Sequence, residues 1–381
     1  MPITMNTIGK LLKIKYASQV EAQANTNVSA WHELIKLNGL TAGGKYYIQP
    51  IELGLNGGVG LSNEVDLPNA SDPILDEFKV ETKNLFGVFG ITKKVLKTNQ
   101  TPEKVVNLLT NSMNSLVTSL RWNLSRSLEM DHMGVLAKVA GAVNSASTVT
   151  LDDVQYLMPG LVISFYTSDG AYTDSAKVIN VERSTNSITL SKAVSVSENS
   201  MVTIYKSYGM ELTGLNDIFS KTGTVYGLDK SKYNILVPTI NTVPEISDSV
   251  ILDCINDCED YHNVKINYIR MSPDVEKAYL AYKQKNNLNV ASMEIKGGYN
   301  EMSFNGKIPM VKSKFAPKGT LDCLDSTKFQ MYKLGEGEFD DETGSILTRE
   351  SGQASYTGLY TMFAEQYCRT PGGMGRIKIT A

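Results

Sequence analysis

The sequence has little histidine, cysteine or tryptophan, and no excess of charge of either sign. It has 381 residues, with three histidines, four cysteines and two tryptophans, so an enzyme built on histidine chemistry would have little material. There are 37 Lys and Arg residues and 40 Asp and Glu residues, which gives a formal net charge of −3. A dedicated nucleic-acid-binding protein normally carries a marked basic excess, and this balance argues against one.

The chain also lacks a long hydrophobic run. No stretch approaches the roughly 20 apolar residues that span a bilayer, so we expect no membrane partner. Lysines interrupt the apolar runs of residues 1–15, which therefore have no signal-peptide hydrophobic region. We expect a protein that stays in a reducing cytoplasm, where Cys254, Cys258, Cys323 and Cys368 are free thiols.

Alternation of apolar and polar residues is the first positive feature. It runs through Phe78–Thr82 and Leu85–Ile91 and predicts strands, with the polar, proline-containing segment Asn63–Pro73 as a turn. We therefore predict a long hairpin over residues 54–97, whose arms reach ~50 Å at ~3.3 Å per residue. Because an isolated hairpin is marginally stable in water, either its own domain or another subunit has to cover it.

The clearest helix begins at Thr101-Pro102-Glu103, which supply a cap, a favourable first residue and an acidic first turn. Apolar residues then follow at intervals of three or four, at Val105, Leu109, Met113, Leu116, Leu120 and Leu124. This spacing predicts one buried stripe. A helix that continues to about His132 would be roughly 45 Å long, which indicates a structural spine.

A different pattern follows between residues 147 and 206. Five short strands are predicted, at Thr148–Leu151, Leu161–Phe165, Ala176–Val181, Ser187–Leu190 and Met201–Ile204. Their even spacing predicts a small inserted barrel or sandwich. The sequence shows no aromatic cluster there that would support a receptor or glycan role.

The rest of the chain is mixed, which makes the fold class α+β. Helices are predicted at Ser247–Asp260 and from Ser272, and strands at Phe304–Val311, Leu321–Leu324, Phe329–Tyr332 and in the C-terminal tail. One group of residues suggests chemistry: Cys254, Cys258 and His262 are spaced to share a helical face. Zinc favours such ligands but takes four of them, and cysteines at this spacing usually pack in a core.

In this order, the segments resemble the major capsid proteins of tailed bacteriophages, with the HK97-type fold. The resemblance rests on the hairpin, the spine helix and several short motifs. These motifs are Leu212–Ile218, Thr224–Ser231, Glu294–Gly298, Phe304–Pro309 and Ala316–Thr320. It implies the following domains: 1–42, N-terminal arm; 43–97, extended loop; 98–146, peripheral domain with the spine helix; 147–207, β-rich insertion; 208–345, axial domain and its approach; and 346–381, C-terminal return to the peripheral domain.

The resemblance also implies a function, as a structural protein and not an enzyme, with no cofactor. Pentamers and hexamers of the chain would form an icosahedral shell around double-stranded DNA, which is held without sequence-specific binding. The extended loop would lie across the adjacent subunit. Its tip residues Asn63, Glu64, Asp66, Leu67 and Pro68 would make inter-subunit contacts. Leu109, Met113, Leu116, Leu120 and Leu124 would pack the spine helix.

Partners and location follow from the same resemblance. The segment before the hairpin is short for a fused scaffolding domain, so we expect a separate scaffolding protein, a portal and decoration proteins. Assembly would take place in the host bacterial cytoplasm, and the chain would end in the virion capsid. Two alternatives stay open: an encapsulin-like nanocompartment shell and, more distantly, a cytoplasmic metalloenzyme that uses Cys254, Cys258 and His262.

Overall fold

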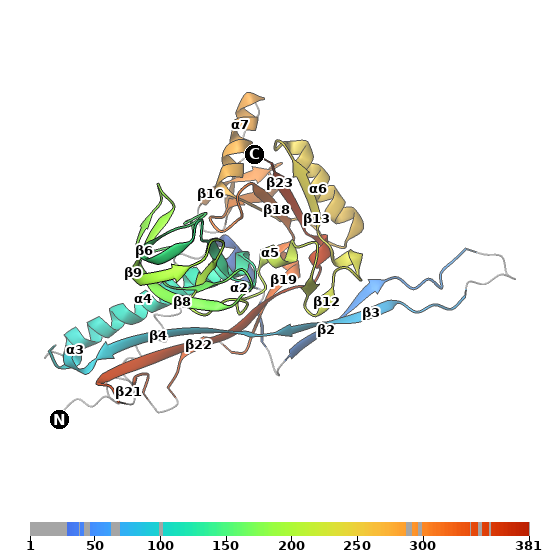
Figure 1. The fold of residues 1–381 in the computed structure, drawn as a ribbon. Coiled ribbons are helices and arrows are strands. Elements are labelled where there is room, and N and C mark those ends of the chain that lie inside the picture. The colour runs from blue at the N-terminus through green and yellow to red at the C-terminus, as the bar shows by residue number, and fades with distance from the viewer. Residues whose placement is uncertain are drawn as a thin grey trace. The chain divides into compact units, whose positions relative to one another are not determined.

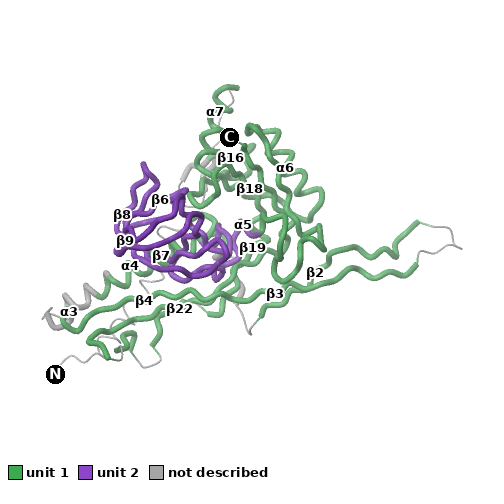
Figure 2. Tube along the Cα trace, in the orientation of Figure 1, with its two compact units in different colours: residues 1–126, 218–381 green, residues 127–217 purple. Residues whose placement is uncertain are grey.

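A computed structural model describes most of the chain (Figure 1). The described residues are 29–37, 39–41, 46–61, 69–98, 102–286, 292–295, 299–335, 337–341, 345–349 and 352–380. They form a mixed structure with several sheets and few helices. The chain divides into two compact units, residues 1–126 with 218–381 (unit 1) and residues 127–217 (unit 2), shown in Figure 2.

Unit 2 is built on a six-stranded antiparallel sheet. Its strands are β5 (Val135–Lys138), β6 (Val143–Thr150), β7 (Val162–Tyr166), β8 (Tyr172–Glu182), β9 (Ser187–Val196) and β10 (Met201–Ile204). They lie in the order β5-β10-β7-β8-β9-β6, and a bridge between Val139 and Leu151 joins the regions beyond the two edge strands. The five predicted strands are present, but the sheet begins with β5, before residue 147.

The core of unit 2 lies within the unit itself. Sixteen residues form one buried apolar cluster, among them Ile163, Phe165, Val178 and Ile188, which are fully buried. Alternate residues of β8 and β9 are buried, as expected of strands with one covered face. A sheet that encloses this much apolar surface needs no other chain to be stable.

Unit 1 contains a seven-stranded sheet in the order β13-β23-β18-β14-β17-β16-β15. Its strands are β13 (Thr239–Val243), β14 (Tyr268–Met271), β15 (Ser292–Ile295), β16 (Tyr299–Phe304), β17 (Ile308–Lys312), β18 (Thr320–Leu324) and β23 (Gly375–Ile379). Helices α6 (Asp248–Tyr261) and α7 (Pro273–Lys285) follow β13 and β14 along the chain, as predicted. The predicted single strand Phe304–Val311 is wrong, because Asn305 and Gly306, both at positive φ, turn the chain between β16 and β17.

A buried ion cluster ties three strands of this sheet together. Asp322 on β18 accepts hydrogen bonds from Arg270 on β14 and Arg376 on β23, and all three side chains are buried. Burial alone would raise the pKa of Asp322, but the guanidinium groups of Arg376 and Arg270 outweigh that effect and lower it. Removing one member of such a cluster leaves a buried charge uncompensated.

The second sheet of unit 1 is organised around the long strand β22 (Ser355–Cys368), which pairs with β19, β20, β21 and β4. The other strands are β1 (Gly39–Thr41), β4 (Lys83–Thr92), β19 (Phe329–Lys333), β20 (Glu338–Phe339) and β21 (Thr348–Arg349). Thus Leu85–Ile91 pairs with the C-terminal strand and not within a hairpin. The predicted hairpin over residues 54–97 is corrected accordingly.

The hairpin itself is a separate two-stranded ribbon of β2 (Tyr46–Gly54) and β3 (Ile74–Glu81). It begins earlier and ends earlier than predicted, and it projects from the rest of unit 1 (Figure 1). A smaller hairpin joins β11 (Thr224–Val225) to β12 (Leu228–Asp229).

The remaining helices are few. They are α2 (Ala30–Leu37), α3 (Lys93–Thr98), α4 (Pro102–Glu129) and α5 (Leu215–Ile218), with short 3₁₀ turns at Asn234–Leu236, Ser326–Lys328 and Pro371–Gly373. Helix α4, with 28 residues, matches the long helix predicted from Thr101 but ends at Glu129, before the predicted end near His132. Across the described ranges, no helix is both long and apolar enough to cross a membrane.

Candidate functional site

The ribbon carries exposed apolar side chains along its outer length. Opposite residues such as Glu52 and Leu75 pair in antiparallel register, with an irregularity between Glu52 and Gly54. The large apolar side chains that remain exposed are Tyr46, Ile48, Leu55, Val59, Leu61, Ile74 and Leu75. Leu75, for example, is 67% exposed. Isolated exposed apolar residues are ordinary, but several of them on one two-stranded element and the segments next to it indicate an interaction surface.

The base of the ribbon is held by aromatic rings. Phe78 on β3 is fully buried and contacts Tyr226 and Tyr367, with ring centroids 5.4 Å and 6.1 Å away. Tyr47 on β2 contacts Tyr332 and Tyr367 at 5.3 Å and 5.7 Å. The Tyr47–Tyr332 pair is tilted and the other three pairs are edge-to-face, and such aromatic pairs stabilise beyond the area that they bury. The ribbon is therefore anchored at one end and left bare at the other.

Tyr226 connects this aromatic base to the β11–β12 hairpin. It occupies the left-handed region at φ 48°, followed by Gly227 at φ 89°, so both central turn residues have positive φ. A bulky residue in this conformation is strained. Its hydroxyl donates to the Gln366 carbonyl at 3.0 Å, and its own carbonyl accepts the Lys79 N–H at 2.9 Å. Burial raises the pKa of this phenol well above its usual value, so it remains a neutral donor.

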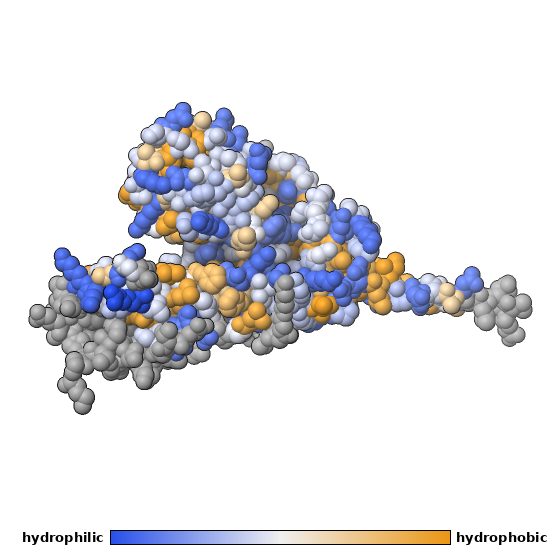
Figure 3. All heavy atoms as spheres, turned by 60° about the horizontal axis from the view of Figure 1, so that its bottom comes forward, coloured by the Kyte–Doolittle hydropathy of each residue, from blue (hydrophilic) through white to orange (hydrophobic). Residues whose placement is uncertain are grey.

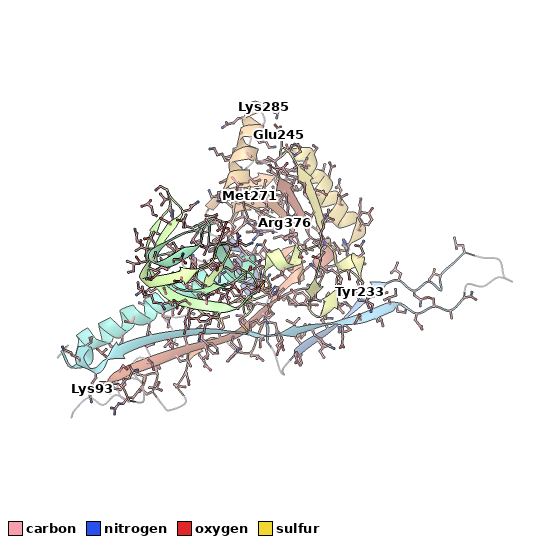
Figure 4. The ribbon with its side chains drawn as sticks, in the orientation of Figure 1. Lys93, Tyr233, Glu245, Met271, Lys285 and Arg376 are labelled. Atoms are coloured by element: carbon pink, nitrogen blue, oxygen red, sulfur yellow. The ribbon has the colours of Figure 1, made fainter. Side chains whose placement is uncertain are left out.

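A polar contact fixes the middle of the ribbon. The Tyr233 hydroxyl, which lies beside the ribbon in Figure 4, donates to Asp76 Oδ2 at 2.7 Å. This bond, followed by the bond from the Glu77 N–H, lowers the pKa of Asp76 below its ordinary value. Lys79 and Glu77 form an exposed ion pair at 2.9 Å along the same strand.

Helix α4 packs against one face of β4 and β22. Leu109 and Met113 are fully buried and share an apolar cluster with Phe89 and Ile91. Leu124 is also buried, whereas Leu116 and Leu120 are half-buried. The helix approaches β4 closely at Gly87, where an added Cβ would lie 2.8 Å from Leu120 Cδ1. Glycine at this position therefore sets the distance between helix and strand.

The opposite face of β4 and β22 has no such cover among the described residues. Phe86 and Val88 on β4 are 54% and 60% exposed, and Thr361 and Leu359 lie opposite them on β22. Figure 3 brings the bottom of Figure 1 forward and shows hydrophobic side chains along this part of unit 1. Among the described residues of unit 1, both the ribbon and this face of β4 therefore expose large apolar side chains.

The tip residues predicted to make inter-subunit contacts, Asn63, Glu64, Asp66, Leu67 and Pro68, lie outside the described residues. Their role stays a prediction. The sequence did not single out Phe78, Tyr226 or Tyr367, because aromatic residues far apart in the chain carry no periodic signal. Only the alternation around Phe78 indicated that one face of β3 is covered.

Cys254, Cys258 and His262 are the residues that were considered as zinc ligands, although cysteines at this spacing were expected to pack in a core. Cys254 and Cys258 are buried on α6, and the pKa of Cys258 is raised by its hydrogen bond with Cys254 and by burial. His262 follows the helix at its C-cap, where burial lowers its pKa. In the described part of the chain, no three His, Cys, Asp or Glu residues are arranged to hold a metal ion.

Comparison with solved structures identifies the class of fold as that of viral capsid proteins. The asymmetric unit of the capsid of cyanophage A-1(L) matches with a TM-score of 0.58 and 12% identity, over 94% of this chain and 95% of that chain. The capsid of the native GTA particle matches with a TM-score of 0.50 and 8% identity, over 94% and 93%.

A third match is the holo-SrpI encapsulin of Synechococcus elongatus PCC 7942, with a TM-score of 0.47 and 9% identity over 94% of each chain. No family model matches the sequence, and neither does any curated protein. The resemblance to phage major capsid proteins is thus confirmed in the fold, over nearly the whole chain.

Proposed function

We propose that this chain is the wall protein of an icosahedral shell and has no enzymatic role. The observation that carries the proposal is the ribbon of β2 and β3, anchored by buried Phe78 but exposing Leu55, Leu61 and Leu75. Fully burying such a side chain contributes roughly 1.5–3 kcal/mol, so several of them covered together would drive association. The likeness in fold to phage and GTA capsids supports the same function.

In the proposed shell, the ribbon of one subunit lies on the next subunit. Contacts of this kind join unlike surfaces and close into rings, here pentamers and hexamers. The second exposed apolar face, with Phe86 and Val88 on β4, is a candidate surface for such contacts. The tip residues Asn63, Glu64, Asp66, Leu67 and Pro68 would reach the neighbour, and the α4 side chains Leu109, Met113, Leu116, Leu120 and Leu124 would keep the spine rigid.

The proposed contents of the shell are double-stranded DNA, enclosed without sequence-specific contacts. A net charge of −3 suits a wall that does not bind phosphates tightly. An encapsulin-like compartment that holds protein cargo is the second candidate, because an encapsulin is among the matched structures. Identifying the cargo of purified particles, genome or protein, separates the two.

Deletion of residues 58–76 tests the proposal. We expect a soluble chain that forms no shells by electron microscopy. A second variant, Leu55→Ser with Leu61→Ser and Leu75→Ser, keeps the chain length and removes only apolar surface. The matched control, Met158→Ser with Ile179→Ser, removes exposed apolar side chains from unit 2. Normal particles from both ribbon variants would contradict the proposal.

Assembly of the chain expressed alone tests its proposed partners. If a separate scaffolding protein is required, expression alone yields no closed shells of uniform size. Co-expression with a scaffolding protein then restores them. A portal and decoration proteins belong to the same proposal and would be found by mass spectrometry of purified particles.

A further inference from the structure

Unit 2 contains a group of aromatic rings that the sequence did not predict. Tyr166 ends β7 and Tyr172 begins β8, while Tyr205 and Tyr208 follow β10, which pairs with β7. Tyr166 stacks on Tyr208, with centroids 4.9 Å apart, and meets Tyr172 edge-on at 5.7 Å. We call these four tyrosines, together with Lys206, the tyrosine patch.

The floor of the tyrosine patch is rigid. Tyr166 is only 8% exposed, and the turn between Tyr166 and Tyr172 is closed by hydrogen bonds from the Thr167 N–H to the Ala171 carbonyl and from the Ala171 N–H to Thr167 Oγ1. Gly170 lies against the Tyr208 ring, where a Cβ would come within 2.9 Å of the ring. The Tyr166 and Tyr208 rings are therefore held in position before any ligand arrives, and a preformed floor lowers the entropic cost of binding.

A left-handed backbone conformation at Lys206 places its side chain beside the tyrosine rings. Its φ of 53° is left-handed, and its N–H donates to Ser164 Oγ at 3.1 Å. This conformation sets the ammonium 5.4 Å from the Tyr205 ring centroid and 6.0 Å from that of Tyr172. Within the described residues it has these two rings and no ion-pair partner. Backbone strain at a non-glycine residue points to a functional constraint.

Two properties of the surface narrow the class of ligand. Tyr172 and Tyr205 are 48% and 50% exposed, so two ring faces with phenol hydroxyls flank one available cation. Residues 127–217 contain ten Asp and Glu against five Lys and Arg, which disfavours a nucleic acid. Five side chains are also far fewer than the roughly 20–30 residues that each side of a stable protein interface uses.

We propose that the tyrosine patch is a saccharide-binding site. A pyranose ring has apolar C–H faces that pack on the exposed rings of Tyr172 or Tyr205, while its hydroxyls bond to the phenols. A hydroxyl or carboxylate oxygen of the sugar accepts a hydrogen bond from Lys206. This site is independent of shell assembly, because its residues lie on a unit with its own core.

Calorimetric titration of the full chain tests the site, with maltohexaose and chitohexaose as neutral probes and a guluronate oligomer as the carboxylated probe. We expect binding of at least one probe in the micromolar to millimolar range. Tyr172→Ala with Tyr205→Ala should weaken it at least tenfold, whereas the control Ile179→Ala, an exposed apolar residue elsewhere in unit 2, should not. Lys206→Gln should weaken the guluronate oligomer more than the neutral probes if the carboxylate is the recognised group.

Lys206→Gly separates a binding role from a structural one. Glycine relieves the left-handed strain, so thermal stability should stay equal or rise while saccharide affinity falls. A lower melting temperature for this variant would assign Lys206 to the fold and overturn the proposal. Failure of all three saccharides to bind at 10 mM would overturn it too, as would tighter binding of oligothymidylate. Shell formation, followed by electron microscopy in the same variants, should be unchanged.

Discussion

Unit 2 and the β2–β3 ribbon are both made of antiparallel strands whose side chains alternate between two faces. They differ in whether the apolar side chains are buried within the chain. In unit 2, sixteen buried residues close around one another. In the ribbon, only the base is covered, through Phe78 and Val80, while Leu55, Leu61 and Leu75 stay exposed. Alternation of apolar and polar residues indicates that one face of a strand is covered. It does not report whether the cover belongs to the same chain.

The sharpest test of this difference is a cavity in unit 2. Phe165 is fully buried there, and Phe165→Ala should destabilise the unit by ~3–5 kcal/mol. Amide exchange of residues 127–217 should accelerate while that of unit 1 changes little. Ile179→Ala, at an exposed position of β8, serves as the control. Equal acceleration in both units would show that unit 2 does not fold on its own core.

The base of the ribbon should respond more locally. Phe78→Ala removes a buried ring that contacts Tyr226 and Tyr367 and should cost ~3 kcal/mol. We expect faster exchange of the Lys79 amide, which donates to the Tyr226 carbonyl, and no change in unit 2. Leu75→Ala, farther along the same strand, should leave that amide protected. An unchanged Lys79 amide in Phe78→Ala would refute the anchoring role of the aromatic base.

Acid should loosen the ribbon through Asp76. The pKa of Asp76 is lowered in the folded chain. Its carboxylate therefore stabilises the fold at pH values above the ordinary pKa of 3.8, and this stabilisation is lost as the pH falls through the lowered pKa. Tyr233→Phe removes the first cause of that shift, so an NMR titration should find the Asp76 pKa closer to its ordinary value. Tyr47→Phe, whose hydroxyl donates to Gln49, should leave it unchanged.

The smallest effect on the isolated chain is expected at Leu75. Since this side chain is exposed, Leu75→Asp should change the free energy of unfolding by less than ~0.5 kcal/mol. The same change should prevent shells from forming, because it places a charge where apolar contact is proposed. Ile179→Asp, at a position of unit 2 that is 58% exposed, should still assemble. If Leu75→Asp chains form normal particles, the bare part of the ribbon is not an assembly surface.

Local sequence patterns predicted most of the helices and strands correctly. They did not predict which strands, far apart in the sequence, pair with one another. The helices predicted from Ser247 and Ser272 are present as α6 and α7, with these serines at their N-caps, and the five strands predicted at even spacing are present in unit 2. The ribbon was placed too late in the sequence because β4 alternates like β3 but pairs with β22 instead. Alternation cannot identify a partner strand.

The tyrosine patch was missed for a related reason. Two of its rings lie at either end of the turn between β7 and β8, and the other two lie in the segment after β10. These rings come together only because β10 pairs with β7. Tyrosines on either side of a tight turn were the available signal. For the aromatic base of the ribbon, alternation indicated that Phe78 is covered but did not identify Tyr367 as a residue that covers it.

The pairing of β4 with β22 has a consequence for the timing of synthesis. Phe86 pairs with Thr361, so this contact forms only after Thr361 has left the ribosome. The contacts of unit 2, in contrast, join residues close together in the sequence. Because chains fold as they emerge and local contacts form fastest, unit 2 should be complete while the sheet around β22 is still missing its central strand. The aromatic base, which needs Tyr367, is then also unfinished. Each nascent chain thus acquires a firmly placed ribbon only near the end of its translation, which in the proposed shell would delay association between chains made on the same messenger RNA.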